Sequence, residues 1–173
     1  KELETFKNSK DEEIQIRAAE KAEELAQEII ANKDIEIDPW ELIELGNAAM
    51  LRGSLHTSES YFRKSLDLFK NNDAEGEARS LNNLGLIADT RGDLAEAERL
   101  HKESLAIERE IGNREGEARS LNNLGLIAMV RGDLAEAERL HMESLAIKRE
   151  IGNRQGEANS LGNLGLIADT RGD

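Results

Sequence analysis

Apolar residues in the second half of the chain recur every three or four positions, which is the spacing of one face of an α-helix. Residues 115–130 carry such a stripe at Ala118, Leu121, Leu124, Ile127 and Ala128. A second stripe, over residues 134–147, consists of Leu134, Ala137, Leu140, His141, Ser144, Leu145 and Ile147. Gly132 interrupts the pattern between them. The pattern therefore predicts two antiparallel helices joined by a short turn.

Polar residues at the ends of these stripes predict where the helices begin and end. Asp133, followed three positions later by Glu136, is typical of a capping box, in which the first side chain accepts hydrogen bonds from first-turn amides. Gly152 is expected to terminate the second helix, and Asn153 is expected to cap the helix after it.

The sequence of this helical pair recurs along the chain. Residues 75–114 and 115–154 differ only at Asp89/Met129, Thr90/Val130, Lys102/Met142 and Glu108/Lys148, and a third copy runs from Gln155 to Asp173. Drift on a surface explains the changes to Met129 and Val130, and the alternative is a small apolar pocket for a ligand side chain. A fixed repeat of this length is the signature of a solenoid, in which each unit buries its apolar face against its neighbours.

An older unit precedes the near-identical ones. Leu45-Gly46, Arg52-Gly53 and Ser65-Leu66 match Leu84-Gly85, Arg91-Gly92 and Ser104-Leu105. We therefore predict a diverged unit at 37–74, full units at 75–114 and 115–154, and the first helix of a truncated unit at 155–173. Residues 1–36, with an amphipathic stretch over 12–31, are predicted to be a helical cap or a degenerate repeat. Because the chain starts at Lys and ends within a repeat, we expect it to be part of a longer protein.

Composition narrows the classes of partner. A formal net charge of −13 leaves no surplus of Lys and Arg to replace counterions on phosphates, which argues against nucleic acid. The absence of cysteine excludes disulfides and thiolate metal sites and fits a reducing compartment, so we expect a cytoplasmic protein. No apolar run approaches the ~18 residues of a membrane span.

Residues that invite a catalytic or metal-binding interpretation have structural explanations. His101 and His141 fall in the packing stripe of the second helix, so we expect structural histidines with satisfied ring nitrogens. Arg-Gly-Asp occurs at 91–93, 131–133 and 171–173, where the glycine makes the turn and the aspartate caps a helix. The carboxylates form no constellation of nucleophile, base and orienting group. We expect no enzyme activity, no cofactor and no metal.

The pattern Ala118-x-x-Leu121-x-x-Leu124-Gly125-x-x-Ala128, followed by Gly132-Asp133-Leu134-x-x-Ala137, resembles the tetratricopeptide repeat. The period exceeds the usual 34 residues and is similar to the long-repeat class, which includes kinesin light chains, the LGN/Pins adaptors and prokaryotic sensor proteins. The resemblance covers residues 37–173, with Glu44 standing where the other units have asparagine. It implies an all-α, right-handed superhelical solenoid of antiparallel helix pairs.

The resemblance also implies a function. In such arrays an extended peptide lies in a concave groove lined by the first helices, and recurrent asparagines hold its backbone. Carried over here, these are Asn83, Asn123 and Asn163, because a carboxamide both donates and accepts hydrogen bonds. Asn82, Asn122 and Gly162 should also face the groove. Arg79 and Arg119, another turn away with Asn159 at the same register, would grip an acidic group of a protein or peptide ligand.

Each of these residues has an alternative role. The asparagines could instead cap or bridge adjacent helices, and the arginines could pair with neighbouring glutamates. Two other functions also stand beside peptide binding. Leu161, Leu164 and Ile167 have no second helix to cover them and predict a homo-oligomer that assembles through open solenoid ends. The remaining alternative, by analogy of fold, is that the array is the sensor of a larger signalling ATPase or transcription regulator.

Overall fold

The computed structural model describes residues 24, 28, 37–70 and 72–172. These residues contain helices and no strand, and the helices are α3 (Pro39–Leu51), α4 (Leu55–Phe69), α5 (Ala74–Thr90), α6 (Leu94–Glu110), α7 (Arg114–Val130), α8 (Leu134–Glu150) and α9 (Arg154–Arg171). The prediction for residues 1–36 falls outside the described residues, apart from Glu24 and Glu28, which are helical.

The chain divides into two compact units, residues 1–64 and 65–173, with the boundary inside α4. In the first unit, Asp38 caps α3 by accepting a hydrogen bond from the Trp40 amide at 3.0 Å, and Pro39 occupies the first turn. The Phe62 ring covers Gly46. The Ser58 hydroxyl donates to the Gly46 carbonyl at 2.8 Å, which joins α4 to α3.

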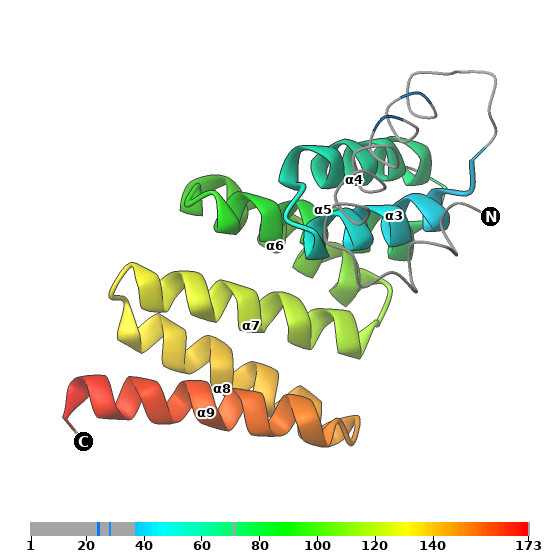
Figure 1. Cartoon of the computed structure of the whole chain (residues 1–173). Helices are drawn as coiled ribbons and strands as arrows, with labels where there is room; N and C mark the ends of the chain where they lie inside the picture. Colours follow the sequence, from blue (N-terminus) through cyan, green and yellow to red (C-terminus); the bar gives the residue numbers. More distant parts are fainter. Residues whose placement is uncertain (1–23, 25–27, 29–36, 71, 173) are drawn as a thin grey trace, which may run out of the picture. The chain divides into compact units, whose positions relative to one another are not determined.

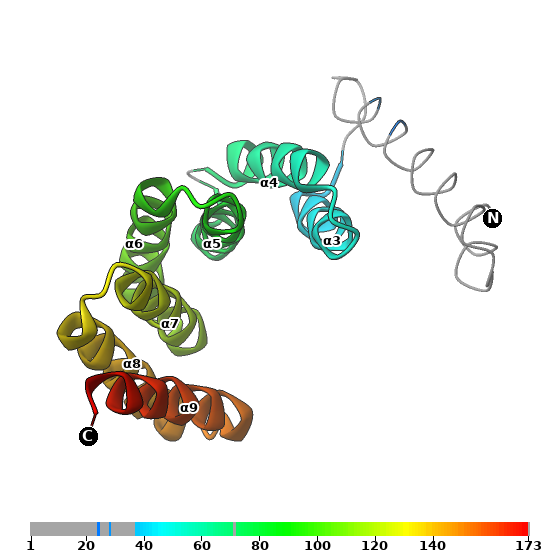
Figure 2. The ribbon, with the colours of Figure 1, turned by 60° about the vertical axis from the view of Figure 1, so that its left-hand side comes forward.

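The second unit is a stack in which each helix from α6 to α9 packs against the one before it (Figure 1). Figure 2 shows that α5 and α7 lie on the inner side of this stack and α6 and α8 on the outer side. The prediction of an all-α repeat solenoid is confirmed. The division into repeat units stays a prediction.

The predicted helix ends agree closely with the structure. Helix α7 begins at Arg114, one residue before the predicted Glu115, and ends at Val130 as expected. Asp133 accepts a hydrogen bond from the Glu136 amide at 3.1 Å, and Asn153 accepts one from the Gly156 amide at 2.8 Å. The capping box is only half formed, because the Glu136 carboxylate bonds instead to Arg139, one turn further along α8.

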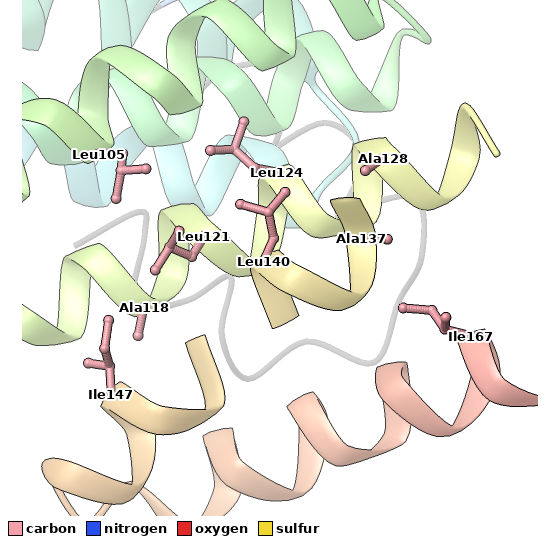
Figure 3. Close-up of a cluster of buried hydrophobic side chains, with 9 residues drawn as sticks. All are labelled: Leu105, Ala118, Leu121, Leu124, Ala128, Ala137, Leu140, Ile147 and Ile167. Carbon is pink, nitrogen blue, oxygen red and sulfur yellow. The ribbon is translucent and has the colours of Figure 1, made fainter. Parts of the chain in front are cut away.

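Apolar side chains from four helices form the core of the second unit (Figure 3). Ile147 of α8 points toward Ala118 of α7, and Leu140 of α8 lies beside Leu124 of α7. The buried cluster is completed by Leu105, Leu121, Ala128, Ala137 and Ile167. Ile167 of α9 points back toward the α7–α8 pair, so the third copy adds to the same core.

Buried serines repeat the same bond in successive units. The Ser104 hydroxyl of α6 donates to the Ala78 carbonyl of α5 at 2.9 Å, and Ser144 of α8 donates to Ala118 of α7 at 2.7 Å. Ser104 also lies 3.2 Å from the Ser120 hydroxyl of α7. These bonds fix each outer helix against its inner partner. Buried carbonyls that keep a hydrogen bond avoid a desolvation cost of about 1–3 kcal/mol each.

The histidines of the packing stripe cover glycines. His101 lies over Gly85 and His141 over Gly125, in the position that Phe62 occupies over Gly46. Their packing role is confirmed, but the prediction of satisfied ring nitrogens is wrong. Both nitrogens of each ring are buried without a hydrogen-bond partner among the described residues. Burial lowers the pKa of each histidine to about 4.

Among the described residues, we find no helix with both the length and the apolar character that crossing a bilayer requires.

Candidate functional site

The predicted asparagine ladder lies on α5, α7 and α9, and its members differ in burial. Asn82 and Asn83 of α5 are buried, at 3% and 8% exposure. Asn122 and Asn123 of α7 and Asn163 of α9 are half-buried. The ladder is therefore most accessible on α7 and α9.

The asparagines contact one another across successive inner helices. The Asn123 side-chain amide donates to the Asn82 side-chain oxygen at 3.1 Å, and Asn163 donates in the same way to Asn122 at 3.2 Å. Such pairs bridge adjacent helices, which is the alternative role that the sequence left open. Each donating carboxamide keeps a second N–H and its oxygen for other partners. Bridging and ligand binding are therefore compatible.

The two predicted arginines lie near an acidic residue that sequence reasoning did not select. Glu108 of α6 is 3% exposed and its carboxylate lies over Gly116. Its Oε2 atom has no hydrogen-bond partner among the described residues. Burial raises the pKa of Glu108 to about 7, although Arg119, Arg79 and a hydrogen bond from Asn113 oppose this and Glu75 adds to it.

The next unit has a lysine at the same place. Lys148 of α8 is 8% exposed, and its side chain lies over Gly156, where an added Cβ would come within 2.9 Å of Cδ. Its ammonium donates to the Ser160 hydroxyl at 2.9 Å. Burial lowers the pKa of Lys148. In the earlier unit, Phe69 fills the corresponding position over Gly76.

Lys148 lines a cavity of about 440 Å³ between α7, α8 and α9. Arg119 and Lys148 supply the positive charges of its lining, and Glu115 supplies the negative charge. The other lining residues are Ala118, Asn122, Ile151, Asn153, Gln155, Gly156 and Asn159. The structure thus brings together the predicted Arg119 and Asn122 with Lys148, which the sequence did not single out.

Sequence spacing carried a signal for the burial of Lys148. It lies seven positions after His141 and four after Ser144, so it continues the stripe that predicts the inward face of this helix. A charged side chain was not expected there, because lysine is almost never fully buried unless it is paired.

A second cavity, of about 240 Å³, lies between α6, α7 and α8. Its lining includes the core residues Leu105, Leu121 and Leu124. The charged residues at this cavity pair with one another: Arg131 with Glu98, Arg109 with Glu143, and Arg139 with Glu136 and Glu143. This arrangement offers a ligand fewer uncompensated charges than the cavity beside Lys148.

The Arg-Gly-Asp tripeptide at 131–133 is structural, as predicted. Arg131 binds Glu98 and donates to the Leu94 carbonyl at 3.1 Å. Gly132 has a φ of +79°, which a residue with a side chain rarely adopts, and Asp133 caps α8. The tripeptide is thus occupied in joining α6, α7 and α8.

The predicted self-association residues of α9 have different environments. Leu161 is 46% exposed and Leu164 is half-buried. The expectation that Ile167 lacks cover is wrong, because it is 1% exposed and packs into the core. Leu166 is exposed instead, at 57%.

Met129 and Val130, the two apolar replacements near the end of α7, lie in different surroundings. Met129 packs against the core cluster, whereas Val130 is exposed. They do not share one environment as the apolar-pocket interpretation requires. Among the described residues there is also no group of three or more His, Cys, Asp or Glu side chains that could hold a metal ion.

The tetratricopeptide repeat family model matches residues 41–110 and 116–173. No curated protein matches. BtubC (BKLC) from P. vanneervenii is similar in structure, with a TM-score of 0.74 and 21% identity over 93% of this chain and 70% of that one.

Two further solved structures share the fold. The apo form of RapI has a TM-score of 0.78 and 17% identity, over 98% of this chain and 61% of that chain. A putative kinesin light chain from Podosopora anserina with nearly identical TPR-like repeats has a TM-score of 0.66 and 18% identity, over 91% of this chain and 81% of that one. At these identities the likeness concerns the fold alone.

Proposed function

Because the chain belongs to the tetratricopeptide repeat family, we propose that it binds an extended segment of another protein along α5, α7 and α9. Tetratricopeptide repeats generally mediate protein–protein interaction and are typically non-catalytic scaffolds. The proposal places the ligand on the inner side of the stack, where the asparagines recur.

The observation that carries the proposal is the pairing of Asn123 with Asn82 and of Asn163 with Asn122. Each pair holds a carboxamide in one orientation before a ligand arrives. Preorganised groups lose less conformational freedom on binding, so more of the interaction energy remains as affinity. The remaining N–H and oxygen of Asn123 and Asn163 would then bond to peptide units of an extended chain, whatever its side chains.

Charged residues beside the asparagines would select among ligands. Arg119 lines the cavity next to Asn122 and is suited to an acidic group, since a guanidinium binds a carboxylate through two parallel hydrogen bonds. Arg79 is less suited, because it does not line this cavity. Both arginines also interact with Glu108, Arg119 more strongly than Arg79. We therefore expect ligand selection to be stronger at α7 and α9 than at α5.

The experiment is affinity capture from a lysate with wild type and with Asn123→Ala/Asn163→Ala, followed by titration of the captured segment. The matched control is Asn72→Ala, since Asn72 is exposed and, among the described residues, its side chain bonds to the nearby Leu68 carbonyl alone, at 3.2 Å. We expect the segment to be lost by the double variant and retained by the control. Equal recovery by all three proteins would contradict the proposal.

Self-association is a second candidate, favoured by the exposure of Leu161 and Leu166 on α9. Gly165 adds to this face, since nothing lies within 4 Å of a Cβ built on it, whereas His141 covers the corresponding Gly125. Sedimentation of wild type and Leu161→Glu tests it: an oligomer that the substitution leaves intact would contradict this interface. A sensor role in a larger signalling protein stays a prediction.

A further inference from the structure

One buried position distinguishes units that are otherwise nearly identical. Of the four differences between residues 75–114 and 115–154, only Glu108/Lys148 has both residues buried. Another of the four differences, Lys102/Met142, also changes the charge, but both residues are exposed, so the change costs little stability. At 108/148 the change reverses the charge of a side chain that lies over the first turn of the next inner helix.

The Lys148 ammonium has fewer partners than a buried cation requires. It has three N–H donors, and the part of the chain that the structure describes supplies one acceptor, the Ser160 hydroxyl. Among the described residues no carboxylate lies within ion-pair distance of it. A buried charge without a partner of opposite sign is strongly destabilising, and an entering anion would relieve that cost.

The cavity lining has a formal charge of the opposite sign to the molecule. Arg119 and Lys148 against Glu115 give +1, in a chain whose net charge is −13. The residues of α9 at this cavity are uncharged: Gln155 and Asn159 stand where the preceding unit has Glu115 and Arg119, so one charge of each sign is absent. Replacing that glutamate removes a carboxylate that would repel an anion, and the carboxamides of Gln155 and Asn159, themselves 3.3 Å apart, add donors.

The preceding unit lacks this excess of positive charge. Glu108 occupies the place of Lys148, beside Glu75 as well as Arg79 and Arg119. The two carboxylates and two guanidinium groups there sum to zero, so no excess positive charge is left for a third carboxylate. An acidic group of a ligand is thus favoured at one of two neighbouring units and disfavoured at the other.

We propose that the cavity beside Lys148 and Arg119 binds the carboxylate of an acidic side chain in the bound segment, and that this contact fixes the register of the segment along the near-identical units. The inference rests on the proposed function and deepens it, because asparagines that bond only to a peptide backbone do not distinguish one unit from the next. Lys148 supplies that distinction.

The first experiment uses two short, capped alanine peptides, one with a central glutamate and one with glutamine. Binding is followed in the full chain by NMR, from the side-chain amides of Asn122 and Asn159 and the backbone amide of Gly156. We expect the glutamate peptide to shift these signals and to bind at least about tenfold more tightly than the glutamine peptide, a typical effect for a buried charge pair. Equal binding of the two peptides, or no binding of the glutamate peptide, would overturn the inference.

The chain itself offers a matched variant. Lys148→Glu is expected to fit, because Glu108 occupies the same position over a glycine in nearly identical surroundings. It should abolish the preference for glutamate. The double exchange Glu108→Lys/Lys148→Glu keeps composition and net charge, and it should move the shifted signals by one unit, to Asn82 and Gly116. Signals that stay at Asn122 and Gly156 in both variants would contradict the proposal.

Two further arms separate the possible outcomes. In the first, inorganic phosphate is tested in place of the peptide. If phosphate binds and requires Lys148, whereas the glutamate peptide does not bind, the assignment to a carboxylate would be overturned. Binding that depends on Asn123 but not on Lys148 would leave the proposed function intact and remove the register contact. Binding that depends on Lys148 but not on Asn123 would leave the anion site and remove the asparagine ladder.

Discussion

The imidazole of His141 lies over Gly125, so close that a Cβ added to Gly125 would come within 2.8 Å of the ring. We expect Gly125→Ala to destabilise the chain by about 1–3 kcal/mol, because the ring is fully buried and has no room to move away. Gly165→Ala is the control at the same register of α9. Its Cβ meets nothing within 4 Å, so it should gain up to about 1 kcal/mol of helix propensity. Urea unfolding that shows similar effects for the two variants would contradict this close approach.

His141 and His101 should make the fold sensitive to acid. Their pKa of about 4 in the folded chain lies below the ordinary value of 6.5. Their contribution to stability is therefore complete above pH 6.5 and is lost as the pH falls through about 4, by about 3 kcal/mol for each ring.

His141→Phe should remove part of this sensitivity. Phe62 fills the same place over Gly46, so the ring is expected to fit, and the change eliminates two unsatisfied nitrogens. Urea unfolding of both proteins at pH 4 and pH 7 tests the prediction. The variant should lose less stability than wild type between pH 7 and pH 4, and an unchanged acid loss would show that the ring is not the titrating group.

Glu108 should act in the opposite direction. Its pKa is raised from 4.5 to about 7, so its contribution to stability is complete below pH 4.5 and is lost as the pH rises through about 7. Glu108→Gln should therefore stabilise the chain at pH 8 by up to about 3 kcal/mol and have little effect at pH 4. Glu150→Gln is the control, because that carboxylate is exposed and paired with Arg114. Equal responses of the two variants to pH would contradict the burial of Glu108.

Periodicity alone predicted the helices, because the apolar stripe of each helix is local in the sequence and repeats with the helical turn. Caps such as Asp133 and Asn153 were predictable for the same reason. The pairing of Asn123 with Asn82 was not, since it depends on how two inner helices align. Ile167 was misjudged because its burial depends on which face of α9 turns toward α8. The burial of Lys148 was not predictable either, because lysine is usually exposed, and only the packed structure shows this side chain to be buried.

The most direct test of the central claim, that the inner helices bind an extended segment, is calorimetric titration of a captured segment into wild type, Asn123→Ala and Asn82→Ala. Asn82 is buried and supports Asn123, whereas Asn123 would itself contact the ligand. We predict a loss of affinity of about tenfold or more for Asn123→Ala, from its lost hydrogen bonds to the peptide, and a smaller loss for Asn82→Ala. Affinity unchanged in Asn123→Ala, in a variant that remains folded, would show that the asparagines only bridge helices and would contradict the claim.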